Sequence, residues 1–123
     1  MKSVYTETAP AVVGPYSQAI EANGFLFCAG QIGLDPQTKK LVEGIENQTH
    51  QIMKNITAVL IAAGTDVTKI VKTTIFLTNM DDYKKVNEIY GSYFLQIKPA
   101  RSAVAVASLP AGALIEIECI AVL

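Results

Sequence analysis

Residues 114–123, the last segment of the chain, are apolar on both faces if they form a strand, and this constrains the fold more than any other feature. Successive side chains of a strand point to opposite sides of the sheet. Two apolar stripes result: Ile115, Ile117 and Cys119 on one face, Ile120 and Val122 on the other. A strand of this kind needs cover on both sides. If helices cover one side, we expect another copy of the chain to cover the other.

The first half of the sequence predicts a hairpin followed by a helix. Residues 17–22 and 25–29 form the hairpin, joined at Asn23-Gly24, a dipeptide that tight primed turns favour. Apolar residues then recur with helical spacing over residues 45–63, and Gly64 supplies a terminating residue. This pattern indicates an amphipathic helix packed on a sheet.

The second half predicts a strand, a helix and two strands. Residues 70–77 are rich in β-branched side chains, and an amphipathic helix follows Asn79 with apolar positions continuing to Ile97. Two further strands cover residues 101–107 and 114–123. The order of elements predicts one α+β domain over residues 1–123, with the helices on one face of a mixed sheet.

Composition narrows the classes of partner. Only 17% of the residues are charged, below the roughly 25% of an average soluble protein, which favours an oligomer. The net charge of -1 and the presence of a single arginine argue against nucleic-acid binding. No apolar stretch approaches the roughly 18 residues of a membrane span, and the amino terminus lacks the apolar core of a signal peptide. We therefore expect no membrane association and a cytoplasmic location.

The cysteines and the histidine give no evidence for a metal centre. Cys28 and Cys119 lie in apolar strand-like runs without metal-ligand spacing, so we expect buried free thiols. His50 is the only histidine and falls beside Lys54, off the apolar stripe of its helix, where solvent surrounds it. We predict neither a metal nor a cofactor.

Arg101 is the first candidate for a functional residue. It is the only arginine, against nine lysines, and it stands at the start of an apolar strand. Its planar fork of five donors suits a carboxylate, which it can bind through two parallel hydrogen bonds. The alternative is an ion pair with a glutamate at a subunit contact, because arginine is also the preferred residue for interface ion pairs.

Glu116 and Glu118 are the candidate proton-transfer groups. Both project to the side of the last strand that continues in Ile120 and Val122, so at least one carboxylate lies where water meets apolar surface. Such a setting raises a carboxylate's pKa and suits it to proton transfer. The alternative is that both glutamates belong to a solvated strand edge.

A hairpin between the last two strands would separate these candidates. Centred on Pro110 and Ala111, it would pair Arg101 with Ile120 and leave Glu116 roughly 13 Å away along the ladder. Either the two strands are not neighbours in that register, or the site takes its groups from two subunits.

Several separated motifs resemble the RidA/YjgF reactive intermediate deaminase family over nearly the whole chain. These are Gly14-Pro-Tyr-Ser-Gln18, Ala29-Gly-Gln-Ile32, Ala63-Gly64, Val86-Asn87, Pro99-Ala-Arg-Ser102, Leu109-Pro110 and Ile115-Glu-Ile-Glu118. The resemblance implies a chorismate-mutase-like α+β protomer, a mixed six-stranded sheet with two helices on one face, and a homotrimer with ligand clefts between subunits.

The resemblance also implies a reaction, the hydrolysis of 2-imino acids and their enamines (2-aminoacrylate, 2-iminobutanoate, 2-iminopropanoate) to 2-oxo acids and ammonia without a cofactor. Arg101 would bind the carboxylate with the backbone N–H of Ala103. Glu116 would activate the water, with the Gly30 carbonyl as a second acceptor. Family positions that line or support the cleft correspond to Tyr16 and Asn87, with Tyr93 or Phe94 as an apolar wall.

Two positions depart from the family pattern, and two other functions remain open. Many relatives have cysteine where this chain has Ala103, and serine where it has Ala29, which removes a thiol and a hydroxyl from the implied cleft. The same cleft could bind a 2-oxo acid in a regulator without catalysis. An endoribonuclease or translation inhibitor, an activity attributed to some relatives, is disfavoured by the single arginine and the lack of a basic patch.

Overall fold

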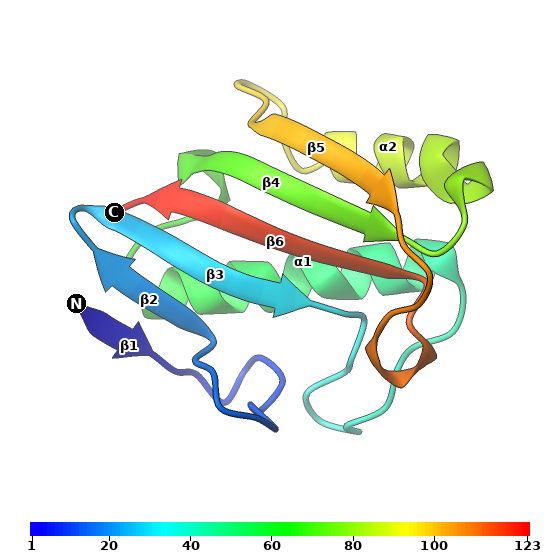
Figure 1. The fold of residues 1–123 in the computed structure, drawn as a ribbon. Helices are drawn as coiled ribbons and strands as arrows, with labels where there is room; N and C mark the ends of the chain where they lie inside the picture. Colours follow the sequence, from blue (N-terminus) through cyan, green and yellow to red (C-terminus); the bar gives the residue numbers. More distant parts are fainter.

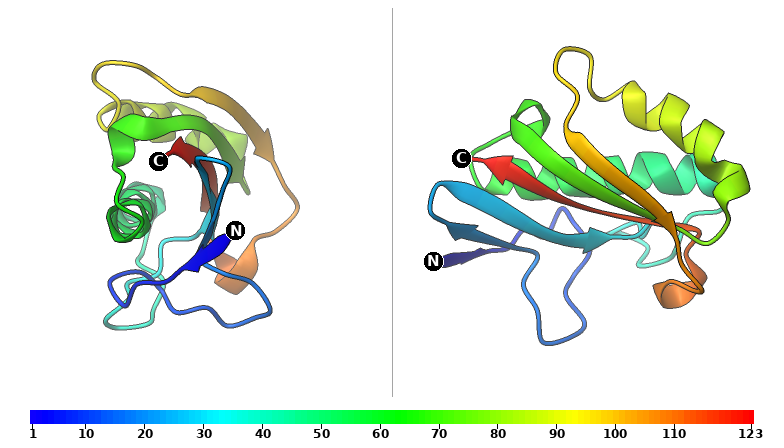
Figure 2. Two further views of the ribbon diagram at one scale, coloured as in Figure 1. Left: turned by 90° about the vertical axis from the view of Figure 1, so that its left-hand side faces the viewer. Right: turned by 45° about the horizontal axis from the view of Figure 1, so that its top comes forward.

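A curved sheet of six strands carries both helices on one face and leaves the other face bare (Figures 1 and 2). The computed structural model describes all residues, 1–123. The strands are β1 (Lys2–Val4), β2 (Ala19–Ala22), β3 (Phe25–Gln31), β4 (Ile70–Leu77), β5 (Ala100–Ala105) and β6 (Ile115–Val122); the helices are α1 (Ile45–Ala62) and α2 (Tyr83–Gly91). The order in the sheet is β1-β2-β3-β6-β4-β5, and only β4 and β5 run parallel. The predicted α+β class, with two helices on one face of a mixed sheet, is confirmed.

The opening hairpin forms at the predicted turn. Asn23 and Gly24 both have positive φ, 52° and 81°, as a primed two-residue turn requires. A short strand that the sequence pattern did not predict, β1, extends the hairpin at the sheet edge by pairing Val4 with Ala19. With only three residues, β1 is too short to display an alternation.

The two helices differ in how well the sequence located their ends. Helix α1 ends beside Gly64, whose φ of 82° lets the chain turn away, within one residue of the predicted end. Helix α2 ends at Gly91, so the prediction that helical packing continues to Ile97 is wrong. Ile97 is 84% exposed in the segment between α2 and β5. Neither helix combines the length and hydrophobicity needed to cross a membrane.

The last two strands are not neighbours, because β4 lies between them. Arg101 of β5 and Cys119 of β6 are both level with Thr73 of β4. The simple hairpin centred on Pro110 and Ala111 is therefore not the arrangement of this chain. A crossover through α2 joins the parallel pair β4 and β5, as is usual for parallel neighbours.

The helix-facing side of the sheet carries the core, and the bare side is also largely apolar. Core residues of β4 and β6 with 1% exposure or less are Ile75, Leu77, Ile115, Ile117 and Ala121. Side chains of opposite parity project to the bare side, where the apolar ones include Ile20, Phe25, Phe27, Phe76, Val104, Ile120 and Val122. This bare apolar face is the one that the sequence assigned to another subunit.

Candidate active site

The guanidinium of Arg101 lies between strand β5 and helix α2. Its Nη2 donates a hydrogen bond of 2.9 Å to the hydroxyl of Tyr83. The guanidinium carbon is also 5.4 Å from the centre of the Tyr83 ring and 5.1 Å from that of Tyr90, within the range of cation–π attraction. Two tyrosines of α2 therefore hold Arg101 on the helix side of the sheet.

Tyr90 is itself held in place by a hydrogen bond to the sheet. Its hydroxyl shares a buried hydrogen bond of 2.7 Å with Thr73, the residue of β4 that pairs with Arg101. Burial raises the pKa of Tyr90, so the phenol stays neutral at physiological pH. No carboxylate of the chain forms an ion pair with Arg101, whose charge is left for a ligand or for a partner chain.

Ala103 lies two residues after Arg101 on the same face of β5. The strand is at the edge of the sheet, and the Val106 N–H donates to the Leu77 carbonyl at 2.8 Å. Because alternate N–H groups of an edge strand face its neighbour, the Ala103 N–H faces the open edge. This placement makes it available as a backbone donor near Arg101.

Asn87 lies on the same face of α2 as the two tyrosines. It is four residues after Tyr83 and three before Tyr90, the spacing that places side chains together along a helix. Its Oδ1 is buried and accepts no hydrogen bond. An unsatisfied buried acceptor costs free energy, so this atom is suited to a donor from outside the chain.

Glu116 lies on the bare side of the sheet, against Gly30. It lines a cavity of about 320 Å³ together with Gly30 and Tyr16. The 13 residues around this cavity come from the segment before β2, the end of β3 and the turn before β6, and those not already named include Pro10, Val12, Gln18, Ile32, Leu34, Pro110 and Ala111. Gln18 holds the amino-terminal segment in place through three hydrogen bonds to the backbone of Thr6 and Pro10.

The pKa of Glu116 is raised, first by burial and then by the negative charge of Glu118. A base with a raised pKa is a stronger proton acceptor near neutral pH. The expectation that one carboxylate sits at a boundary between water and apolar surface is confirmed for Glu116, whereas Glu118 is exposed. The structure thus distinguishes two glutamates that the sequence could not separate by chemistry alone.

Replacing Glu118 by glutamine is expected to shift the pH dependence of turnover of 2-imino acids, the substrates that the family resemblance implies. Removal of its negative charge lowers the pKa of Glu116, so the acidic limb of the kcat profile shifts to lower pH while the plateau is kept. A pH series of turnover rates for wild type and Glu118→Gln measures the shift. An unchanged limb would mean that Glu116 is not the titrating base.

Gly30 leaves room for the Glu116 carboxylate. A Cβ at this position would lie 2.6 Å from Glu116 Oε1 and 2.9 Å from its carboxyl carbon, closer than such atoms approach. We expect Gly30→Ala to displace the carboxylate and lower turnover at least tenfold, because displacements of about 1 Å have large effects on reactive geometry. The fold should persist, since the clashing atoms end a flexible side chain.

Gly91→Ala is the matched control for this substitution, because an added Cβ there meets no atom within 4 Å. Activity and melting temperature of the two variants should be compared with wild type. Equal activity of all three would show that the position of the Glu116 carboxylate at Gly30 does not matter.

The two groups of candidate residues lie on opposite faces of the sheet in one chain. Arg101 is level with Thr73 and Glu116 with Phe76, three residues along and two strands across. Their Cα atoms are therefore roughly 14 Å apart, at about 3.3 Å per residue and 4.8 Å per strand. Because Arg101 points to the helices and Glu116 to the bare face, one chain cannot bring both to one small ligand.

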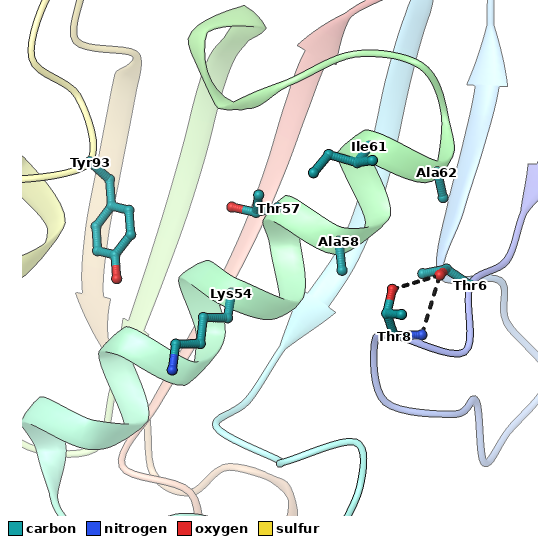
Figure 3. A pocket seen from close by; sticks show the side chains of 8 residues that line it. All are labelled: Thr6, Thr8, Lys54, Thr57, Ala58, Ile61, Ala62 and Tyr93. Carbon is teal, nitrogen blue, oxygen red and sulfur yellow. Dashed lines mark hydrogen bonds between the residues drawn. The ribbon is translucent and has the colours of Figure 1, made fainter.

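Tyr93 and Phe94 join neither group. Phe94 is buried in the core, with its ring centre 4.7 Å from that of Tyr90. The Tyr93 hydroxyl is 2.8 Å from Nδ1 of His50 on α1, which is exposed as predicted. Tyr93 also borders an open hollow of about 600 Å³ on the outer side of α1, where Figure 3 shows it across the helix from Thr6 and Thr8.

The cysteines are free thiols, as predicted, and they face each other across β3 and β6. A hydrogen bond from Cys119 lowers the pKa of Cys28, and the same interaction raises that of Cys119. No group of three or more His, Cys, Asp or Glu side chains is placed to hold a metal ion.

Sequence reasoning missed the contact between Tyr83 and Arg101. The apolar spacing after Asn79 predicted an amphipathic helix and no contact between that helix and Arg101. The available signal was the seven-residue spacing from Tyr83 to Tyr90, which puts both on the face of α2 turned to the sheet. The segment from Pro10 to Val13 carries no motif by which its place in the cavity could have been found.

Comparison with known proteins gives one consistent family. The protein-family model described as Endoribonuclease L-PSP matches residues 6–123 of the chain. Reactive Intermediate Deaminase A of Arabidopsis thaliana is 54% identical over 121 residues, covering 98% of this chain and 65% of the plant protein. The 2-iminobutanoate/2-iminopropanoate deaminase of mouse is 47% identical over 122 residues, covering 98% of this chain and 90% of its own length.

A solved structure agrees with both relatives. The Yersinia pestis protein YyfA, described as a protein of unknown function of the conserved Rid family, superimposes with a TM-score of 0.98 at 55% identity, covering 99% of this chain and 98% of its own. The chain therefore belongs to the L-PSP (RutC/YjgF) family, the family of the reactive intermediate deaminases.

Proposed function

We propose that this protein hydrolyses 2-imino acids, and their enamine tautomers, to 2-oxo acids and ammonia in sites formed between copies of the chain. The observation that carries the proposal is the division of the site. One face offers an arginine without a carboxylate partner, and the other offers a carboxylate of raised pKa in a cavity. A 2-imino acid needs both, because it has a carboxylate to be held and a C=N carbon to be attacked by water.

The Arg101 group would bind and orient the substrate. Its guanidinium would hold the carboxylate through two parallel hydrogen bonds, and the Ala103 N–H at the open edge would add a third. Asn87, with an unsatisfied Oδ1, would accept a hydrogen bond from the substrate or from the second copy. Fixing the carboxylate fixes the direction of the C=N bond, which lowers the entropic cost of attack.

The Glu116 group would activate water. The carboxylate takes a proton from water while the oxygen forms a bond to the substrate C2, giving a tetrahedral carbinolamine. That proton passes to the nitrogen, so the carbinolamine is neutral. The hydroxyl proton is then transferred through Glu116 to the nitrogen as the C–N bond breaks, its electron pair leaves on ammonia, and the ketone forms. The Gly30 carbonyl would orient the water, and Tyr16, across the cavity, would help to enclose it.

The bare apolar face supports assembly of the chains as a homotrimer. A face-to-face dimer would bring two identical faces together and leave the Arg101 group at their edges. In a ring, the bare face of one copy meets the β5 edge of the next, and every copy contributes Arg101 to one cleft and Glu116 to another. A closed ring of three such contacts gives three equivalent sites. We expect no nucleic acid, membrane or cofactor to be required.

The test is release of ammonia and 2-oxo acid from 2-iminobutanoate and 2-iminopropanoate, each generated in solution by an amino-acid oxidase. We expect the protein to accelerate release above the spontaneous rate in the presence of a chelator. An unchanged rate, with 2-oxobutanoate still bound, would replace the enzyme with a carboxylate-binding regulator. RNA cleavage that falls steeply with salt would instead support the endoribonuclease activity named in the family description.

A further inference from the structure

The number of bidentate edges on Arg101 is limited by its contact with Tyr83. A guanidinium can hold a carboxylate through two edges, one formed by Nε and Nη2 and the other by Nη1 and Nη2. Both edges use Nη2, and each uses a different one of its two N–H groups. The Tyr83 hydroxyl accepts one of these N–H groups at 2.9 Å, so only one complete edge remains for a ligand.

We propose that Tyr83 is a positioning residue that fixes the orientation of the substrate carboxylate by occupying one edge of the Arg101 guanidinium. The inference rests on the proposed function, because it gives the carboxylate of the imino acid to Arg101. Tyr83 thereby selects one of the two ways in which the substrate carboxylate can bind to the guanidinium. The residue need not touch the substrate to do this.

The surroundings of Arg101 make this selection rigid. Tyr83 is the first residue of α2, and the guanidinium carbon of Arg101 lies over its ring, 5.4 Å from the ring centre. The guanidinium carbon is also 5.1 Å from the centre of the Tyr90 ring, and the Tyr90 hydroxyl is hydrogen-bonded to Thr73 in the core. Rotation of the guanidinium to offer its other edge would break the bond to Tyr83 and disturb both stacking contacts.

The choice of edge determines where the reacting carbon lies. The two edges point in directions about 120° apart around the planar guanidinium, whose geometry is fixed. A substrate held at the wrong edge keeps its carboxylate hydrogen bonds but carries its C=N carbon away from the water activated by Glu116. Such a complex is occupied but unproductive, so its removal raises turnover without strengthening binding.

The experiment compares Tyr83→Phe with wild type and with Tyr5→Phe. Phenylalanine keeps the ring and its stacking on Arg101 while it frees the second edge. Tyr5 is 61% exposed and remote from Arg101 in the fold, so its variant controls for loss of a phenol elsewhere. We expect kcat and KM of Tyr83→Phe to fall together at least twofold, with kcat/KM unchanged, because a second, unproductive mode competes with the first.

A second readout does not depend on catalysis. Crystals grown with 2-oxobutanoate should show one carboxylate orientation on Arg101 in wild type and two in Tyr83→Phe. A fall in kcat/KM with a raised KM would assign Tyr83 a structural role and overturn the proposal, as would unchanged constants or a wild-type ligand that displaces the Tyr83 hydroxyl. If the wild type hydrolyses no imine but binds 2-oxobutanoate, the crystals still decide the role of Tyr83; absence of binding refutes both proposals.

Discussion

Arg101→Ala is expected to abolish measurable imine hydrolysis while the chain still folds and assembles. Two hydrogen bonds between charged groups are worth about 1.5–3 kcal/mol each, so their loss lowers kcat/KM by roughly 10²–10⁴-fold. The fold should survive because Arg101 makes no ion pair within the chain. Initial rates of 2-oxo acid release, with circular dichroism and gel filtration of the same sample, measure both outcomes.

Arg101→Lys is the matched variant, because it keeps the charge and loses the planar fork. We expect it to recover only part of the activity, since an ammonium group cannot form the two parallel bonds that orient the carboxylate. Normal activity in Arg101→Ala would remove Arg101 from the site and end the assignment. Full activity in Arg101→Lys would show that charge alone is required.

Glu116→Gln is expected to lower kcat by about 10²–10⁴-fold, with little change in the affinity for 2-oxobutanoate. Glutamine keeps the size of the side chain but cannot accept the proton of the attacking water, and water activation belongs to the transition state rather than to carboxylate capture. Turnover rates and calorimetric titration with 2-oxobutanoate separate the two quantities. An equal loss of turnover in Glu118→Gln would contradict the choice of Glu116 over its neighbour.

Glu116→Gln is also expected to change the stability of the protein, and this change checks that the variant folds. The pKa of Glu116 is raised in the folded state, so the folded protein holds the proton more tightly than the unfolded chain. That stabilisation is complete below the unfolded-state pKa and is lost as pH rises through the folded-state pKa. Glu116→Gln should therefore raise Tm relative to wild type at neutral pH and by less in acid. A lower Tm at neutral pH would mean that the carboxylate is stabilised in place.

Local features of the fold were predictable and distant pairings were not. The Asn23-Gly24 turn and the β-branched run of β4 carry their structure in a few adjacent residues, and both form where predicted. The insertion of β4 between β5 and β6 depends on contacts between residues far apart in sequence, which periodicity does not encode. The end of α2 was missed because the apolar spacing continues through Phe94, which reaches the core without being helical.

In the candidate site, too, some features could be predicted from the sequence and others required the structure. The chemistry of the side chains made Arg101 the first candidate, since the use of one arginine against nine lysines favours a role for its planar fork. The raised pKa of Glu116 depends on its burial beside Gly30, and the tie between Arg101 and Tyr83 depends on where α2 crosses β5. That Arg101 and Glu116 face opposite sides of the sheet could be read only from the strand order.

The central claim, that each site joins Arg101 of one copy to Glu116 of another, is tested most directly by mixing two inactive variants. Arg101→Ala and Glu116→Gln chains carrying different affinity tags would be produced together, and assemblies with both tags isolated and weighed by native mass spectrometry. In a ring of three, either composition leaves one site of the three with both residues intact, so we predict about a third of wild-type activity. Mixed trimers as inactive as their parents would show that no site joins Arg101 of one copy to Glu116 of another and would contradict the account.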